Sequence, residues 1–216
     1  MLEEIQAAFK RIEPYVNHTP IMTSRTLNSS VGALIFLKCE NFQRGGAFKC
    51  RGAFNSLLQL KSEKQLKGVV AHSSGNHAQA VALAAGELGI KATIVMPENA
   101  PPVKKAATRG YGATIVESGN APMDRQIEAE RLVKEKEYTL IHPYNYLPTI
   151  HGAGTAALEL IKEAKNLDMV LTPVGGGGLI SGTSISVKGL CNEAKVIGIE
   201  PMNADDAYRS FRDGKI

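Results

Sequence analysis

The chain has 216 residues, 44% of them hydrophobic and 21% charged, which allows one large or two small domains and excludes a disordered protein. Its 25 basic and 21 acidic side chains give a net charge of +4 and are spread along the chain, so nothing in the charge pattern indicates a nucleic-acid partner. No run approaches the roughly 18 apolar residues of a membrane span, and no signal peptide or anchor is evident. Three scattered cysteines predict neither a disulfide framework nor a zinc motif, so we expect a protein of the reducing cytoplasm.

The beginning of the chain predicts two helices separated by short strands and a loop. Apolar residues at helical spacing indicate the first helix, although Pro14 disfavours its last turn. The expected elements are a helix over 2–16, strands at 19–22 and 33–38, a loop at 39–46 and a helix through 53–58.

From residue 68 onward, strands and helices alternate. The expected strands are 68–72, 92–96, 114–117, 139–142, 169–173 and 195–200, and the expected helices are 77–88, 103–109, 124–136, 154–164 and 182–190. Such alternation predicts an α/β fold with parallel sheets covered by helices on both faces. The longest irregular stretch, 143–152, is expected to be a hinge between two sheets.

Four consecutive glycines lie between an expected strand and an expected helix. They are Gly175, Gly176, Gly177 and Gly178. Free backbone N–H groups and a helix dipole converge at such a junction, so it favours an anion. The spacing matches neither the Walker loop nor the dinucleotide fingerprint, which favours a single phosphate group, with a flexible turn that binds nothing as the alternative.

The segment 151–157 contains Gly-x-Gly-x-x-Ala, but no strand directly precedes it and no ribose-binding acid is identifiable. We interpret it as a helix-packing surface.

The segment Ser73-Ser74-Gly75-Asn76-His77 lies at another strand-to-helix junction, where free backbone donors suit a carboxylate, although helix capping alone also explains it.

Lys49 lies among small and apolar residues. A desolvated amine loses its proton more readily, and a neutral lysine attacks aldehydes, which makes Lys49 a candidate for a Schiff base. An ordinary surface lysine is the alternative from local spacing, because lysines are rarely buried. The glycine turn, as a site for one phosphate, favours the Schiff base.

Three motifs in one order carry a resemblance to a known family. They are Lys38-Cys39-Glu40-Asn41-Phe42-Gln43 leading into Ala47-Phe48-Lys49-Cys50-Arg51-Gly52-Ala53, then Ser73-Ser74-Gly75-Asn76-His77-Ala78-Gln79-Ala80, and then Pro173-Val174 with the four glycines. With them the chain resembles the fold type II pyridoxal-phosphate (PLP) enzymes, within them the serine/threonine dehydratase and serine racemase group. The resemblance implies the tryptophan synthase β-like α/β fold, with parallel open sheets and helices on both faces in two domains.

The same resemblance implies a role for each matching residue. Lys49 would hold the cofactor as a Schiff base and then remove the substrate α-proton. Asn76 would hydrogen-bond the ring hydroxyl. The remaining cofactor contacts would come from Phe48, Gly175, Gly176, Gly177, Gly178 and Leu179, and the substrate carboxylate would bind Ser73, Ser74, Gly75, Asn76 and His77.

Two features point toward the racemase members of the group. Ser74 stands where dehydratases often have alanine, and its hydroxyl would deliver a proton to the opposite face of the substrate. The resemblance also implies a site for Mg²⁺ or Ca²⁺ at the Glu200 and Asp206 carboxylates and the Ala204 carbonyl. Without the resemblance, this segment would be an acidic surface turn.

The resemblance also predicts the division of the chain into domains. A small domain at 68–145 would be inserted into a large domain made of 1–67 and 146–216. Members of the family continue for about half as much chain again, including the residue that meets the pyridine nitrogen, so we expect an incomplete large domain.

We therefore expect a PLP-dependent ammonia-lyase that converts L-serine or L-threonine to a 2-oxo acid and ammonia, in a homodimer. Serine racemase and hydroxyaspartate dehydratase are the near alternatives. A truncated, non-catalytic PLP-binding remnant is the alternative from a different class.

Overall fold

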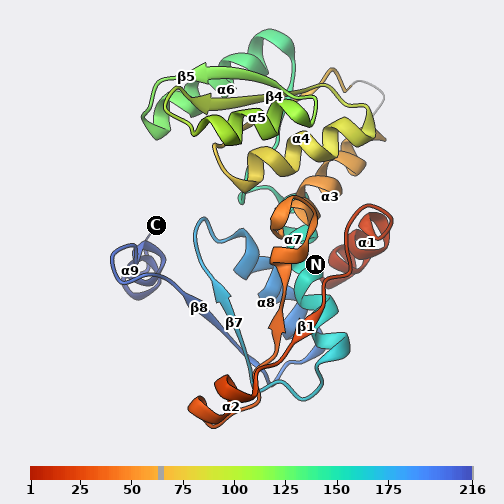
Figure 1. Ribbon diagram of the computed structural model, residues 1–216, viewed down its shortest axis with the longest axis vertical. Coiled ribbons are helices and arrows are strands. Elements are labelled where there is room, and N and C mark those ends of the chain that lie inside the picture. The colour runs from red at the N-terminus through yellow and green to blue at the C-terminus, as the bar shows by residue number, and fades with distance from the viewer. Residues whose placement is uncertain (63–65, 216) are drawn as a thin grey trace.

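The computed structural model describes residues 1–62 and 66–215, and Figure 1 shows their arrangement. The helices are α1 (Leu2–Ile12), α2 (Arg25–Val31), α3 (Lys49–Lys61), α4 (Asn76–Leu88), α5 (Pro102–Gly110), α6 (Pro122–Lys136), α7 (Leu147–Glu163), α8 (Gly178–Leu190) and α9 (Asp206–Asp213). The strands are β1 (Ile21–Met22), β2 (Leu37–Lys38), β3 (Val69–His72), β4 (Ala92–Pro97), β5 (Thr114–Ser118), β6 (Thr139–Leu140), β7 (Met169–Pro173) and β8 (Lys195–Ile199). Two short 3-10 turns, Glu40–Phe42 and Arg44–Gly46, connect β2 to α3.

A parallel sheet in the order β5-β4-β3-β6 forms the upper part of the molecule in Figure 1. Successive side chains of a strand point to opposite faces. Val69 and Ala71 accordingly join the core shared with α4, whereas Val70 joins a second core with Leu132 of α6. Helices therefore cover both faces of this sheet, as the alternation in the sequence predicts.

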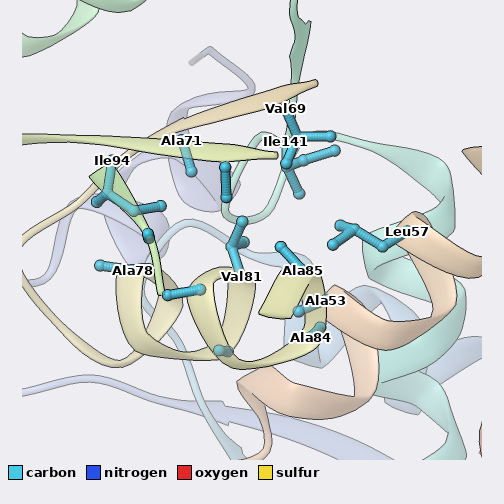
Figure 2. Close-up of a cluster of buried hydrophobic side chains, with 14 of the residues drawn as sticks. Ala53, Leu57, Val69, Ala71, Ala78, Val81, Ala84, Ala85, Ile94 and Ile141 are labelled. Carbon is cyan, nitrogen blue, oxygen red and sulfur yellow. The ribbon is translucent and has the colours of Figure 1, made fainter. Parts of the chain in front are cut away.

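The larger core joins this sheet to α3. Figure 2 shows Val81 and Ala85 of α4 beneath the strands, with Ala53 and Leu57 of α3 entering from the side. Many of the buried residues of α4 are alanines, so the helix lies close to its neighbours. Because α3 begins at Lys49, this core also fixes the helix that carries that lysine.

Glycines bring α3, α7 and α8 into close contact. A Cβ atom at Gly152 of α7 would overlap the carbonyl oxygen of Arg51 in α3. A Cβ at Gly154 would lie 2.8 Å from the Gly182 carbonyl oxygen, and one at Gly182 would lie 2.5 Å from that of Ile150. Only glycine allows backbones to approach so closely, so the interpretation of 151–157 as a helix-packing surface is confirmed.

The lower part of the molecule contains two small sheets. Strands β7 and β8 pair in parallel, and β1 and β2 pair antiparallel. Val170 of β7 packs on Val187 of α8, whereas Met169 and Leu171 are exposed on the other face. Within the described ranges, no helix is long and apolar enough to cross a bilayer.

Several predicted boundaries are wrong. The first helix ends at Ile12 because Pro14 follows, so its predicted extension to residue 16 fails. The predicted strands at 19–22, 33–38 and 139–142 shrink to two residues each. Helices α2 and α9 were not expected, although Ser24 and Gly32 cap α2 at its two ends.

The irregular stretch predicted at 143–152 is too long, because α7 begins at Leu147, and its role as a hinge stays a prediction. Pro148 occupies the first turn, where proline fits a helix, and Gly152 is a packing contact and not a break. In the same way α8 begins at Gly178, four residues before its predicted start at 182. Glycines weaken the helical signal in both places, and tertiary packing overrides it.

Candidate active site

Lys49 is the first residue of α3, and its side chain is partly buried. Its Nζ donates a hydrogen bond to the carbonyl oxygen of Pro143 at 2.7 Å, across 94 residues of sequence. Burial lowers the pKa of Lys49 from 10.5 to about 8. At pH 8 about half of these amines are therefore neutral, the form that attacks an aldehyde. This is not the environment of an ordinary surface lysine.

The tetraglycine turn, residues 175–178, packs against Tyr144. A Cβ atom at Gly176 would overlap the Tyr144 ring, and one at Gly178 would lie 2.9 Å from the Tyr144 Cα. Glycine is therefore required at both positions by the close approach of Tyr144. Because Pro143 precedes Tyr144, the Lys49 amine and the tetraglycine turn contact consecutive residues of one segment.

The tetraglycine turn leads directly into the N-terminus of α8. Gly177 is the N-cap and adopts a left-handed φ of 83°, which glycine accepts without strain. Because the N-cap is a glycine, this helix has no capping side chain at that position, and its first N–H groups point outward with no partner within the helix. This arrangement suits an anionic oxygen such as that of a phosphate.

A second helix N-terminus carries the segment Ser73–His77. Helix α4 begins at Asn76. Its N-cap residue is Gly75, so no N-cap side chain caps this helix. The Gly75 amide instead donates to the Ser73 hydroxyl at 3.1 Å. Ser74 is partly buried and Asn76 is exposed. The free donors of the first turn of α4 suit a carboxylate.

His77 differs from the rest of this segment because its ring is buried. Its Nε2 lies 2.8 Å from the carbonyl oxygen of Ile141, and its Nδ1 has no hydrogen-bond partner among the described residues. Burial lowers the pKa of His77 to about 3, and the nearby positive charge of Lys49 also lowers it. The imidazole is therefore neutral at physiological pH and links α4 to the residues after β6.

The segment 141–145 connects these parts of the site. His142 Nδ1 accepts the Asn145 amide at 2.9 Å, and its ring meets the Tyr144 ring edge-on at 4.6 Å between centroids. Burial lowers the pKa of His142, followed by the charges of His72 and Lys49. Sequence reasoning missed this segment as part of the site, because its contacts come from residues far away in the chain.

The predicted metal ligands lie apart from this site, around the start of α9. The Glu200 carboxylate accepts the amides of Ala207 at 3.2 Å and Tyr208 at 2.8 Å, so it caps α9. Among residues 1–62 and 66–215, no three His, Cys, Asp or Glu side chains are grouped to hold a metal ion. The predicted set of Glu200, Ala204 and Asp206 has only two carboxylates, so the metal site stays a prediction.

Comparison with known proteins adds a family to this geometry. The family model described as pyridoxal-phosphate dependent enzyme matches residues 12–216. A curated L-threo-3-hydroxyaspartate ammonia-lyase of Saccharomyces cerevisiae is 49% identical over 99% of this chain and 65% of the relative. Serine racemase of Dictyostelium discoideum is 46% identical over 100% of this chain and 66% of the relative. The chain thus spans about two thirds of the length of these relatives.

Solved structures agree with the fold of the described chain. A crystal structure of serine racemase from Dictyostelium discoideum has a TM-score of 0.96 at 46% identity, covering 100% of this chain and 70% of that one. A structure of maize serine racemase has a TM-score of 0.96 at 45% identity, covering 100% of this chain and 65% of that one. The resemblance in fold therefore extends over the whole of this chain.

Proposed function

Because the chain belongs to the pyridoxal-phosphate-dependent enzyme family, we propose that it carries the cofactor and substrate sites of an ammonia-lyase. The reaction would convert L-serine or L-threonine to a 2-oxo acid and ammonia. One observation carries the proposal: the Lys49 amine and the tetraglycine turn contact the consecutive residues Pro143 and Tyr144. An aldehyde and a phosphate on one small molecule require an amine and an anion site arranged in this way.

The residues of the site fit PLP. The neutral fraction of Lys49 suits its aldehyde, and Gly175, Gly176, Gly177 and Gly178 with the start of α8 suit its phosphate. Asn76, exposed at the start of α4, would bind the ring hydroxyl, while Phe48 and Leu179 would make the other contacts. When bound, the cofactor supplies an electron sink that stabilises negative charge on the substrate α-carbon.

The residues of this chain would then orient the substrate and move its proton. The segment made of Ser73, Ser74, Gly75, Asn76 and His77 would hold the carboxylate at the N-terminus of α4, where the first amides of the helix have no capping side chain. The Lys49 amine, neutral in part at pH 8, would accept the α-proton. Loss of the α-proton and the β-hydroxyl removes water from the substrate, and hydrolysis then releases ammonia and the 2-oxo acid.

Serine racemisation is the second candidate, and Ser74 is the observation that favours it. Ser74 is a partly buried residue of the loop that precedes Asn76, where its hydroxyl would return a proton to the opposite face of the substrate. The protein is incubated with L-serine, and pyruvate and D-serine are followed together. Pyruvate without D-serine would exclude racemisation, whereas selective loss of D-serine in Ser74→Ala would support it. L-threo-3-hydroxyaspartate is tested as a third substrate, because a curated relative carries that name.

The test of the proposed function combines cofactor binding with turnover. We expect an absorbance band in the visible range when PLP is added, and borohydride reduction followed by peptide mapping should locate the cofactor on Lys49. We also expect 2-oxo acid from L-serine or L-threonine, and none from Lys49→Ala. Labelling of Lys49 without turnover of the three substrates would favour the non-catalytic remnant. No labelling of Lys49 would refute the site.

Four further features belong to the same proposal. The cation site at Glu200, Ala204 and Asp206 would raise thermal stability with Mg²⁺ or Ca²⁺, and Glu200→Gln would abolish that effect. A homodimer would appear in sedimentation as twice the chain mass. A cytoplasmic location agrees with the three cysteines, which are all free thiols in the described structure. The division into a small domain, 68–145, and a large domain, 1–67 with 146–216, also stays a prediction.

A further inference from the structure

Arg51 is wholly buried, two residues after Lys49 in the first turn of α3. Its Nε and Nη2 donate to Glu40 at 2.8 and 2.7 Å, and its Nη1 and Nη2 donate to Glu159 at 2.6 and 2.8 Å. A further bond from Nη1 reaches the Thr155 hydroxyl at 3.2 Å. All five N–H donors of the guanidinium are therefore used.

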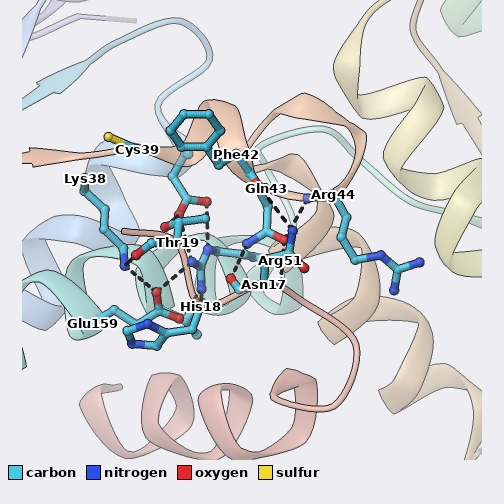
Figure 3. Close-up of polar contacts among 12 residues, drawn as sticks. Asn17, His18, Thr19, Lys38, Cys39, Phe42, Gln43, Arg44, Arg51 and Glu159 are labelled. Carbon is cyan, nitrogen blue, oxygen red and sulfur yellow. Dashed lines mark hydrogen bonds and ion pairs between the residues drawn. The ribbon is translucent and has the colours of Figure 1, made fainter. Parts of the chain in front are cut away.

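Lys38 forms a cluster with Arg51, Glu40 and Glu159, in which two positive and two negative side chains balance. We name it the Arg51 cluster. The Lys38 Nζ lies 2.6 Å from Glu159 Oε2 and donates to the Thr19 carbonyl at 2.7 Å. Figure 3 shows Arg51 and Lys38 approaching Glu159 from different elements. Burial lowers the pKa of Arg51, but its hydrogen bonds to the Glu40 and Glu159 carboxylates raise that pKa by more, so the guanidinium stays charged.

The Arg51 cluster joins three parts of the chain near the start of α3, where Lys49 lies. Glu40 follows β2, Arg51 lies in α3 and Glu159 lies in α7. Helix α7 also packs closely on the backbone of Arg51, because a Cβ atom at Gly152 would overlap its carbonyl oxygen. Arg51 is thus held by its backbone at one turn of α7 and by its side chain almost two turns later.

Helix α7 is also the element that follows Pro143, whose carbonyl accepts the Lys49 amine. The position of the amine beside that carbonyl therefore depends on how the first turn of α3 is rotated relative to α7. A buried ion pair is a weak source of stability, since its desolvation offsets most of the attraction. A role in fixing one geometry explains the cluster better.

We propose that Arg51 is a positioning residue, whose bonds to Glu40 and Glu159 fix the first turn of α3 and hold the Lys49 amine beside the Pro143 carbonyl. The inference rests on the proposed function only in taking Lys49 as the reactive amine. It goes beyond that function by assigning a task to a residue whose side-chain donors are all bound to Glu40, Glu159 and Thr155.

The proposal predicts a measurable change at Lys49 when the Arg51 cluster is weakened. Burial is the cause of the lowered pKa of Lys49, and the groups that face it are the Phe48 ring and the imidazoles of His77 and His142. If the first turn of α3 loosens, water reaches the amine and its pKa rises toward 10.5. The neutral fraction at a fixed pH then falls.

The test measures this fraction without any cofactor. The chain is acetylated with a trace of acetic anhydride between pH 6 and pH 11, and peptide mass spectrometry gives the rate at Lys49, with exposed Lys10 as reference. For Arg51→Lys we expect the inflection at Lys49 to rise by about one pH unit, which slows acetylation at pH 8 about fivefold. Lysine keeps the charge but lacks the planar fork that binds both carboxylates.

Ser56→Ala is the matched control, because it perturbs the same helix pair further along. The Ser56 hydroxyl bonds to the Gly52 carbonyl at 2.8 Å and to Thr149 Oγ1 at 3.0 Å. We expect this variant to lose stability without a change in the inflection at Lys49. Glu40→Gln is a milder second variant, since the Glu40 side chain is 17% exposed, and it should shift the inflection in the same direction as Arg51→Lys.

Three results would overturn the proposal: an unchanged inflection in folded Arg51→Lys or Glu40→Gln, an equal shift in Ser56→Ala, or failure of both cluster variants to fold. The last result would assign the cluster to the fold itself. PLP binding is measured separately on the same proteins. A shift at Lys49 in a chain that binds no PLP would support the positioning role and refute the proposed function, so the two failures are distinguishable.

Discussion

Alanine substitutions at two adjacent glycines test whether Tyr144 lies on the tetraglycine turn. Neither Gly175 nor Gly176 has a positive φ, so backbone strain does not distinguish them. A Cβ at Gly175 meets no described atom within 4 Å, whereas one at Gly176 would overlap the Tyr144 ring. Any difference between the two variants therefore reports the contact with Tyr144.

The expected magnitudes have opposite signs. Gly175→Ala should stabilise the chain by about 0.4–1 kcal/mol, because alanine restricts the unfolded state and fits the open space. Gly176→Ala should destabilise it by about 1–3 kcal/mol, because either the ring or the turn must move. Urea unfolding of the cofactor-free chain should therefore separate the two free energies of unfolding by about 1.4–4 kcal/mol.

A double variant identifies the cause of that difference. With Tyr144→Ala the overlapping ring is absent, so adding Gly176→Ala should cost much less than it does in the native chain. Equal free energies of unfolding for Gly175→Ala and Gly176→Ala would refute the placement of Tyr144. An undiminished cost of Gly176→Ala in the Tyr144→Ala background would refute it as well.

The other predictions concern Lys49, the crossing of α3 with α7, and His77. The rate at which PLP reacts with Lys49 should rise with pH through an inflection near pH 8, and an inflection near 10.5 would contradict the burial of the amine. In thermal unfolding, Gly152→Ala should lower the free energy of unfolding by about 3 kcal/mol or prevent folding, because a Cβ overlaps the Arg51 carbonyl. The control Gly110→Ala, in open space on α5, should be neutral or stabilising in the same assay. The folded pKa of His77 lies below its unfolded value of 6.5, so protonation favours the unfolded chain, and the free energy of unfolding should fall by about 2 kcal/mol from pH 7 to pH 5. In urea titrations His77→Phe should make this fall with pH smaller. An unchanged fall would show that His77 is not its source.

The sequence predicts the fold well where local patterns and tertiary packing agree. The run Val69-Val70-Ala71 is apolar on both sides of the strand, which is typical of a parallel sheet covered on both faces, and the structure places it there. Prediction fails where glycine has a packing role. Gly152 and Gly178 weaken the expectation of a helix, yet both lie in helices because a neighbouring backbone or side chain approaches them closely.

Parts of the candidate site have a local signal and other parts have none. Lys49 and the tetraglycine turn are recognisable by their neighbours in sequence, since small residues indicate close approach or burial. The contact of Lys49 with Pro143 spans 94 residues, and that of Arg51 with Glu159 spans 108. No local pattern indicates such a pair, because only the packing of α3 on α7 brings the residues together.

The central claim is that one site holds both the Lys49 amine and the anion-binding tetraglycine turn. The most direct test compares PLP with pyridoxal, which has the aldehyde but lacks the phosphate. Borohydride trapping and peptide mapping measure how much of each reagent is fixed on Lys49, with and without inorganic phosphate as a competitor. We predict that PLP labels Lys49 at much lower concentration than pyridoxal does. Phosphate should reduce the labelling by PLP and leave the labelling by pyridoxal unchanged. Equal labelling by the two reagents, unaffected by phosphate, would contradict the claim.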